Sequence, residues 1–559
     1  MSILSVFRIC RVRGEPCTSA TVRTLKRAAD DERRSMQSSQ AVRIALSLLF
    51  AFAPVLRAQT PASAEGGFNI KHYGATGNRS DNATRSIQSA IDACTAAGGG
   101  VVYIPPGSYT TGAIQLKDDV NLHLEAGATL FLSQNREDFP ARDRSMINSN
   151  GASNIAVTGR GTLDGLAQYE FVDVRDNDPE IAEEMEIARR AGVPMKRYYR
   201  TGMQTYMFVL NDSTDVRLED ITVVNSPLWN VKLDHCDRIF IRGVRIYSDL
   251  EKGVNSDGID IVSSTNVLIS DSIIVTGDDA IVLKTESRDG PARPVENITV
   301  TNCILTSSST ALMIGTETEA DVRHVIFSNC VIRDSNKGIG INVQDGGTVS
   351  DVRFSNITMD SRRRHWNWWG SAETFRFVLK KRNADSKLGA IRDIVIDNVI
   401  SRARGTSTMI GHAERPLENI TISNLQMRME AEDVPDKRAT DAMRIESVNG
   451  LKLRNVSVEW AQDKTEEKWR SAIHLKNVRR LEIADFTGRQ GLKIGEVATI
   501  VLEDVSGGVI RASQASEGTG TFVEIRGAKT NDLRLRDNDT SKATEPIVFT
   551  EGASSASVK

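Results

Sequence analysis

The sequence predicts an all-β protein built as a parallel β-helix, a solenoid in which short strands of successive coils stack. The first observation is a recurring pattern of apolar-x-apolar, two turn-like residues and a second apolar-x-apolar, as in VRLEDITV and ITVTNCIL. Period-2 alternation with a bend repeated every 20 to 50 residues or so is typical of β-solenoids. The pattern begins at Val216, Ile239, Val267, Ile298, Val325, Val352, Ile394, Ile420, Leu451 and Leu481, mostly at intervals of 23 to 31 residues.

The second observation is that the fifth position of this pattern is usually Asn or Asp. These residues tolerate the left-handed backbone conformation and bond their own backbone in turns, so the column marks one bend of successive coils. Its members are Asp220, Asp271, Asn302, Asn329, Asn356, Asn398, Asn424, Asn455 and Asp485.

Further strands are predicted between the repeats, at 229–233, 258–262, 280–284, 311–315 and 338–342. Separate α/β units are the alternative, but they need crossover helices for which the intervals leave no room. Before the repeats, residues 83–97 have apolar residues at helical spacing and end at Gly98, which predicts a short N-terminal capping helix. A helix there would shield the open edge of the first coil.

Net charge and cysteine content bear on the class of protein. The net charge is −3, with an isoelectric point near 6.3, which argues against a nucleic-acid partner. Six cysteines in 559 residues do not indicate a disulfide scaffold.

The N-terminus resembles a targeting segment. Arg43 precedes the apolar run IALSLLFAFAPVL and a small-residue region that begins at Arg57-Ala58. The competing interpretation is a membrane anchor, but 13 residues fall short of the roughly 20 that span a bilayer. We therefore assign 1–58 to a non-native start, with Met36 as the plausible true start, plus a secretory signal, and expect a secreted or periplasmic protein.

The remaining chain is predicted as a single β-helical catalytic domain at 66–540 with a flexible tail at 541–559. A charged, helix-prone insertion at 173–200 is either a lid over the site or a solvated flank. Trp366, Trp368 and Trp369 lie in SRRRHWNWWGSAETF, where they form either a sugar-stacking wall or core filling.

Three aspartates are the candidate catalytic groups. Asp257 lies two residues before Ile259-x-Ile261, and Asp279 lies two residues before Ile281-x-Leu283. If those stretches are neighbouring parallel strands, the two side chains stack about 4.8 Å apart, with Asp278 beside them. Carboxylates that share a site cannot all ionise cheaply, so at least one pKa should rise, which suits acid/base chemistry.

The chain resembles the polygalacturonase-like proteins of glycoside hydrolase family 28, which are right-handed parallel β-helices of the pectin-lyase type. The resemblance is carried by the capping segment, by GRGTLDG at 159–165, NSPLW at 225–229, NSDG at 255–258 and GDD at 277–279. It implies that Asp278 is the general acid and that Asp257 and Asp279 activate the attacking water. It also implies an inverting mechanism, for which acid and base are usually about 6.5–9.5 Å apart.

Two departures from the family pattern concern the substrate. Thr310 stands where the family has a histidine, and Gly340 and Asn342 stand where an Arg-x-Lys pair grips a galacturonate carboxylate. Lys284 and Lys232 face the same side from other coils. The expected reaction is therefore cleavage of O-glycosidic bonds in a pectic-type polysaccharide or oligosaccharide. Recognition of the substrate's carboxylate charge has either moved to other residues or been lost.

Two other interpretations stay open. A polysaccharide lyase of the same fold would bind Ca²⁺ through the aspartates but needs a cationic base, and the aspartate column predicts no Arg or Lys. A non-catalytic carbohydrate-binding solenoid would explain the missing histidine. We expect no cofactor or metal, a monomer, and no membrane association after signal cleavage. The candidate substrate-binding residues are Asn255, Thr310, Lys284, Asn342, Trp229, Trp368 and Trp369.

Overall fold

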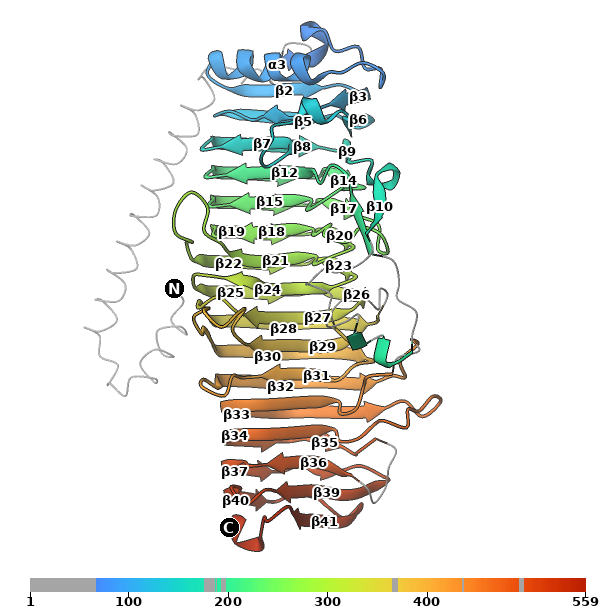
Figure 1. Ribbon diagram of the computed structural model, residues 1–559, viewed down its shortest axis with the longest axis vertical. Helices are drawn as coiled ribbons and strands as arrows, with labels where there is room; N and C mark the ends of the chain where they lie inside the picture. Colours follow the sequence, from blue (N-terminus) through green and yellow to red (C-terminus); the bar gives the residue numbers. More distant parts are fainter. Residues whose placement is uncertain are drawn as a thin grey trace, which may run out of the picture. The chain divides into compact units, whose positions relative to one another are not determined.

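The computed structural model describes residues 67–174, 186–187, 189–192, 198–363, 370–434, 437–491 and 497–559. The predicted signal region at 1–58 lies outside them. Gly67–Lys559 forms one compact unit. All but two of its described strands join a 39-stranded sheet with parallel pairing, which winds as a right-handed parallel β-helix as predicted (Figure 1). Among the described residues, no helix has the length and apolar character needed to cross a membrane.

Each coil contributes strands to three stacks. The first stack contains β4 (Ile114–Gln115), β7 (Ser145–Asn150), β12 (Tyr206–Asn211), β15 (Val231–Asp234), β18 (Ile259–Val262), β21 (Ile281–Thr285), β24 (Thr310–Thr318), β27 (Lys337–Val343), β29 (Glu373–Leu379), β31 (Ser407–Ile410), β36 (Ala498–Glu503), β39 (Thr519–Arg526) and β41 (Ala543–Thr550).

The second stack contains β1 (Phe68–Asn69), β2 (Gly100–Ile104), β5 (Val120–Leu124), β8 (Ser153–Gly159), β13 (Thr214–Glu219), β16 (Asp237–Arg242), β19 (Thr265–Ser270), β22 (Val295–Thr301), β25 (Val322–Ser328), β37 (Ser506–Arg511) and β40 (Asn531–Arg536). The third contains β3 (Gly107–Thr111), β6 (Ala128–Leu132), β9 (Thr162–Asp164), β14 (Thr222–Val224), β17 (Arg245–Tyr247), β20 (Ile273–Thr276), β23 (Ile304–Ser307), β26 (Val331–Ser335), β35 (Thr487–Gly488) and β38 (Gln514–Ala515). Longer strands run round a bend and serve two or three stacks: β28 (Thr348–Ser361), β30 (Ala390–Ala403), β32 (Leu417–Met429), β33 (Met443–Trp460) and β34 (Ile473–Ala484).

The bend between the second and third stacks confirms the predicted column of Asn and Asp. All nine residues, from Asp220 to Asp485, have φ between 50° and 63°. Their amides also bond along the column, as Asn356 Nδ2 does to Asn329 Oδ1 at 3.1 Å and Asn398 Nδ2 to Asn356 Oδ1 at 2.8 Å. The bend is thus held both within a coil and between coils.

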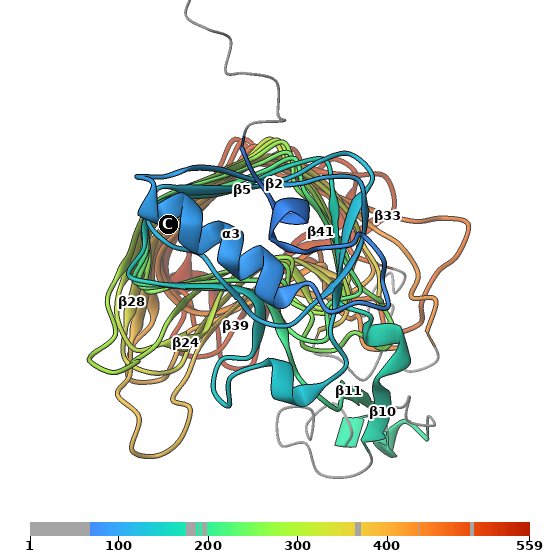
Figure 2. The same ribbon diagram turned by 90° about the horizontal axis from the view of Figure 1, so that it is seen from above.

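The capping helix is also confirmed. Helix α3 (Thr84–Ala96) lies across one end of the stack, where Figure 2 shows it over the coils below. It buries Ile87, Ala90, Ile91 and Cys94. Gly98 follows with φ of 92°, a conformation that glycine adopts without strain.

The C-terminal segment 541–559 is not the flexible tail that the sequence predicts. It contains β41, which pairs with β39 from Thr519↔Ala543 to Arg526↔Thr550. Its alternation is less regular than in earlier coils, which is why the sequence pattern missed it.

The insertion at 173–200 is framed by an antiparallel pair, β10 (Phe171–Val174) and β11 (Tyr198–Thr201). Most of its predicted helix lies outside the described residues.

Candidate active site

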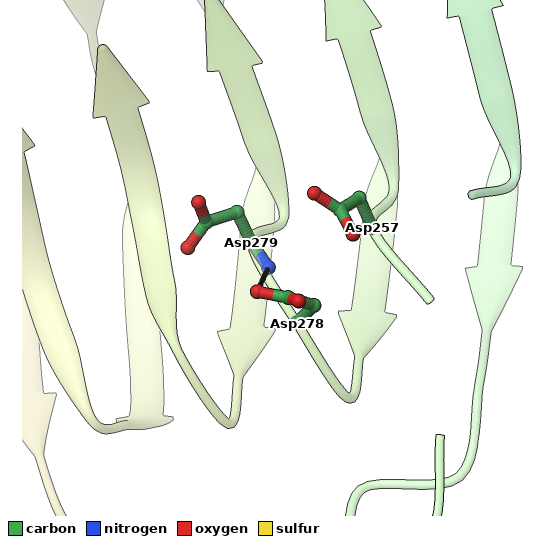
Figure 3. A group of neighbouring side chains, drawn as sticks. All are labelled: Asp257, Asp278 and Asp279. Atoms are coloured by element: carbon green, nitrogen blue, oxygen red, sulfur yellow. Dashed lines mark hydrogen bonds between the residues drawn. The ribbon is translucent and has the colours of Figure 1, made fainter. Parts of the chain in front are cut away.

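The three aspartates lie on the turns that lead from the third stack into the first. Strands β18 and β21 pair with Ile259 opposite Ile281 and Ile261 opposite Leu283. Asp257 and Asp279 therefore hold equivalent places in adjacent coils, as the sequence predicts, and Figure 3 shows Asp278 on the turn beside them. The core side chains Ile259, Ile261, Ile281 and Leu283 are fully buried and fix this register.

One carboxylate oxygen of each aspartate lies within 4.8 Å of one from each of the other two. Two glycines permit this close packing of turns. A Cβ on Gly258 would lie 2.3 Å from the Ala280 carbonyl oxygen, and one on Gly277 would lie 2.2 Å from the Gly253 carbonyl oxygen. The glycines of the NSDG and GDD motifs are therefore required by backbone contact between coils.

Main-chain hydrogen bonds fix two of the carboxylates. The Asp279 N–H donates to Asp278 Oδ1 at 2.8 Å, and the Thr310 N–H donates to Asp279 Oδ1 at 2.8 Å. Ser307 Oγ and Thr276 Oγ1 donate to the Asp278 carbonyl oxygen at 2.6 and 2.7 Å. The backbone that carries the pair is thus held from its own coil and from the next one.

Burial dominates the electrostatics of the aspartates. Asp257, Asp278 and Asp279 are only 3%, 6% and 7% exposed. Burial, followed by repulsion from Asp278, raises the pKa of Asp257 well above its ordinary value. Burial, followed by repulsion from Asp279, does the same to the pKa of Asp278. Asp257 and Asp278 therefore hold a proton to higher pH than ordinary carboxyl groups do, and the sequence predicts such a raised pKa for at least one member of the group.

Lys284, predicted as a substrate-binding residue, lies among carboxylates of the protein. Its Nζ lies 2.9 Å from Asp260 Oδ1, 3.5 Å from Asp257 Oδ2 and 3.9 Å from Glu317 Oε2. The same atom lies 3.6 Å from the centroid of the Trp229 ring. The ammonium is therefore engaged inside the protein, next to a candidate catalytic carboxylate.

Trp229 lies one coil before Asp257, since Val231 pairs with Ile259. Tyr206 meets its ring edge-on at 5.8 Å. The half-buried Trp229 thus borders the aspartates, as a wall for a sugar would, although Lys284 occupies one of its faces.

Of the other predicted substrate-binding residues, Thr310 and Asn342 lie in the coils after Asp279, and Asn255 lies on the same turn as Asp257. Thr310 holds the place of Asp279 one coil on and is 1% exposed, and its Oγ1 has no hydrogen-bond partner among the described residues. Asn342 Oδ1 is likewise buried and unbonded within the described chain. Asn255 is half-buried with φ of 61°. Trp368 and Trp369 lie outside the described residues.

Three charged residues near the site were missed from the sequence. Thr310 pairs with Lys337, so this buried lysine continues the column of Asp257 and Asp279, and the prediction that the column has no Arg or Lys is wrong. The same offset of two residues before a strand, applied to Ile339, would have found it. Arg376 lies opposite Gly340 one coil on. Asp260, the polar residue inside the strand GIDIV, is fully buried next to Lys284.

Burial acts to lower the pKa of Lys337, while Asp279 and Glu373 oppose it, and the pKa falls below its ordinary value. Burial raises the pKa of Asp260 to about 7 against the attraction of Lys284. These two groups therefore titrate closer to neutral pH than their types usually do.

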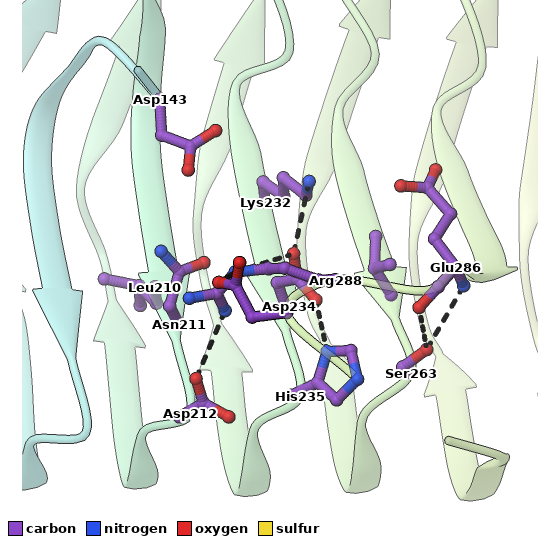
Figure 4. Close-up of polar contacts among 12 residues, drawn as sticks. Asp143, Leu210, Asn211, Asp212, Lys232, Asp234, His235, Ser263, Glu286 and Arg288 are labelled. Carbon is purple, nitrogen blue, oxygen red and sulfur yellow. Dashed lines mark hydrogen bonds and ion pairs between the residues drawn. The ribbon is translucent and has the colours of Figure 1, made fainter. Parts of the chain in front are cut away.

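A second polar cluster lies at the far ends of the same strands (Figure 4). The Asp234 carboxylate forms an ion pair with Lys232, with Oδ2 3.2 Å from Nζ, and its Oδ1 lies 2.5 Å from His235 Nδ1. Arg288 Nη1 lies 3.2 Å from Asp212 Oδ2. Lys232 is thus paired within its own coil.

Comparisons with known proteins agree with these motifs. The family model described as glycosyl hydrolases family 28 matches residues 94–364, which include the three aspartates. The chain is 28% identical over 224 residues to a probable polygalacturonase of Vitis vinifera, which covers 39% of this chain and 44% of that protein. It is 25% identical over 298 residues to an exo-poly-alpha-D-galacturonosidase of Dickeya chrysanthemi, covering 46% and 49%. The chain thus spans about half the length of the curated relatives it matches.

Among solved structures, a hyperthermoactive exopolygalacturonase from Thermotoga maritima superimposes with a TM-score of 0.56 and 22% identity. The match covers 70% of this chain and 91% of that one. At this identity the likeness shows the fold, which is the predicted β-helix.

Proposed function

Over residues 94–364 the chain belongs to family 28 of the glycosyl hydrolases, and we propose that it is a glycosidase that cleaves O-glycosidic bonds of a pectic-type polysaccharide. The observation that carries the proposal is the group of three nearly buried aspartates, whose oxygens come within 4.8 Å of one another. Folding gains nothing from crowding like charges, so such a group is expected at a site for acid/base chemistry.

The surroundings support two different roles among the three carboxylates. Asp278 is the general acid: burial and the neighbouring Asp279 raise its pKa, which favours the protonated form, and Asp278 gives that proton to the oxygen of the leaving sugar. Asp257, next to the Lys284 ammonium, and Asp279, held by the Thr310 N–H, hold the attacking water, and one of the two accepts its proton as the water oxygen bonds the anomeric carbon. Of the ion pairs that join described residues, those of Lys284 reach Asp257 and not Asp278, which favours this division.

Inversion of the anomeric carbon is proposed from the family resemblance. The nearest oxygens of the aspartates are closer than the roughly 6.5–9.5 Å expected between the carboxyl groups of inverting enzymes. The spacing therefore does not support inversion by itself, and the stereochemistry needs direct measurement.

The substrate class rests on the relatives, whose names refer to polygalacturonase and galacturonosidase activity. Export to the cell exterior or periplasm follows from the apolar segment after Arg43 and belongs to the same proposal, as does action as a monomer. Digestion of a panel of pectic polysaccharides, with reducing ends and near-ultraviolet absorbance followed together, tests the reaction. New reducing ends without absorbance support hydrolysis.

One observation favours a second candidate. Lys337 is a buried lysine of lowered pKa in the aspartate column, and a lyase needs a base of this kind to remove a proton beside a uronate carboxylate. Unsaturated, absorbing products would select this reaction over hydrolysis. Binding of polysaccharide without either product would indicate a non-catalytic solenoid.

A further inference from the structure

Asp260 is a fourth buried carboxylate next to the three aspartates. It lies on β18, one residue beyond Ile259, and points out of the coil, away from the apolar core. Its exposed fraction is zero. Burying a carboxylate is costly unless a cation accompanies it, and here the cation is Lys284, with its Nζ 2.9 Å from Asp260 Oδ1.

The Lys284 ammonium lies between Asp260 and Asp257. It comes from the adjacent strand β21, opposite Val262 of β18. Its side chain is 7% exposed, and the Trp229 ring covers it at 3.6 Å. Burial acts to lower the pKa of Lys284, but Asp260 and Asp257 outweigh burial and hold that pKa well above its ordinary value. The ammonium therefore stays charged across the pH range of a hydrolase.

Other charged groups face this pair from the neighbouring strands. Asp278 and Asp279 face Asp257, while Lys232 acts on Asp260 from β15. Glu317 on β24 lies 3.9 Å from Lys284, and Tyr206 on β12 and Glu286 after β21 lie within electrostatic reach of the pair. Lys232 is bound to Asp234 at 3.2 Å, so Lys284 is the nearer cation for both Asp257 and Asp260.

We infer that Asp260 and Lys284 are a positioning pair for Asp257: the Asp260 carboxylate anchors the ammonium, and the ammonium favours the ionised form of Asp257 and orients that carboxylate toward the attacking water. This inference rests on the proposed function. Lys284 thereby supplies, from the side of Asp257, a fixed positive charge that Thr310 cannot provide from the side of Asp279.

The inference replaces the role in substrate binding that the sequence suggests for Lys284. A sugar carboxylate would have to displace Asp260 or Asp257, or the Trp229 ring, to reach the ammonium. A substrate-binding lysine and a positioning lysine also differ in measurable ways. Loss of the former weakens binding of acidic substrates only, whereas loss of the latter changes the pH profile on every substrate.

The test is the pH dependence of kcat/KM from pH 4 to 9 for Lys284→Met and Asp260→Asn, measured on acidic and on esterified substrate. Lys284→Met removes the charge that favours ionised Asp257, so the acidic limb should move up by about one pH unit or more. Asp260→Asn removes a charge that repels Asp257 and competes for Lys284, so the limb should move down. Both shifts should appear on both substrates, and the limb belongs to the coupled carboxylates as a group.

Lys284→Arg keeps the charge and should restore a limb close to that of the wild type. Lys476→Met is the matched control, because Lys476 holds the equivalent place on β34, pairs with Glu503 at 2.8 Å and lies six coils away. If Lys284→Met does not fold, Asp260→Asn decides alone, since an amide fits the same space and leaves Lys284 paired with Asp257.

Unshifted limbs in Asp260→Asn and in folded Lys284→Met, or a loss confined to the KM of the acidic substrate, would overturn the inference. Failure of the proposed function is distinguishable, because the wild-type protein would then hydrolyse none of the substrates.

Discussion

The main-chain N–H of Thr310 donates to Asp279 Oδ1 at 2.8 Å, and the Thr310 hydroxyl bonds none of the described residues. The residue that stands where family 28 has a histidine thus holds the column of candidate catalytic aspartates through its backbone. Its side chain is 1% exposed beside the aspartates, and we expect its hydroxyl to bond a substrate hydroxyl when the site is occupied.

Thr310→Val tests that division. The backbone bond to Asp279 survives, so the free energy of unfolding should not fall. Loss of one neutral hydrogen bond to substrate, worth about 0.5–1.5 kcal/mol, should lower kcat/KM by roughly two- to tenfold. A loss of a thousandfold would show that Thr310 takes part in the chemistry.

Asp278→Asn should abolish turnover while the fold is kept, because an amide cannot protonate the leaving oxygen. Loss of a positioned acid lowers the rate by on the order of 10²–10⁴. Asp271→Asn is the control: it is also an Asp-to-Asn change close in sequence, on a half-exposed bend where Asn is equally suited. If Asp278→Asn keeps more than a tenth of wild-type activity, the acid is another residue.

Ile281→Ala and Leu283→Ala should each destabilise the protein by about 2–5 kcal/mol, since both side chains are fully buried beneath the aspartates. Leu268→Ala, at a position 43% exposed on the second stack, should change stability by no more than about 0.5 kcal/mol. Chemical denaturation measures all three. Equal stability of the core and surface variants would refute the register that stacks Asp257 on Asp279.

We expect weak action on unesterified polygalacturonate, because neither Gly340 nor Asn342 carries the positive charge with which Arg or Lys would bond a carboxylate. Such bonds contribute about 1.5–3 kcal/mol each, so losing two lowers kcat/KM by about two orders of magnitude. Rhamnogalacturonan or esterified fragments should be better substrates. A tenfold preference for plain polygalacturonate would contradict this prediction, and Lys337→Met and Arg376→Met would then locate the rebuilt site.

The β-helical architecture could be predicted from the sequence because the same residue pattern repeats in coil after coil. The bend column is visible in the sequence since one side-chain type satisfies the same left-handed backbone in coil after coil, as at Asn329 and Asn356. Asp257 and Asp279 followed from the same register argument. Asp260 and Lys284 did not, because their pairing depends on side-chain reach across two strands, which the alternation of β18 and β21 does not encode. Lys337 was accessible to the same offset rule, applied one coil further.

The most direct test of the account is the stereochemistry of the first product, followed by ¹H NMR in D₂O from the moment enzyme meets pectic polysaccharide. With Asp278 as acid and Asp257 and Asp279 activating water, the new reducing end should first appear in the anomeric configuration opposite to that of the cleaved bond. Its other anomer should then grow only at the rate of mutarotation. First appearance with retained configuration, or of an unsaturated sugar, would contradict the assignment of these three aspartates.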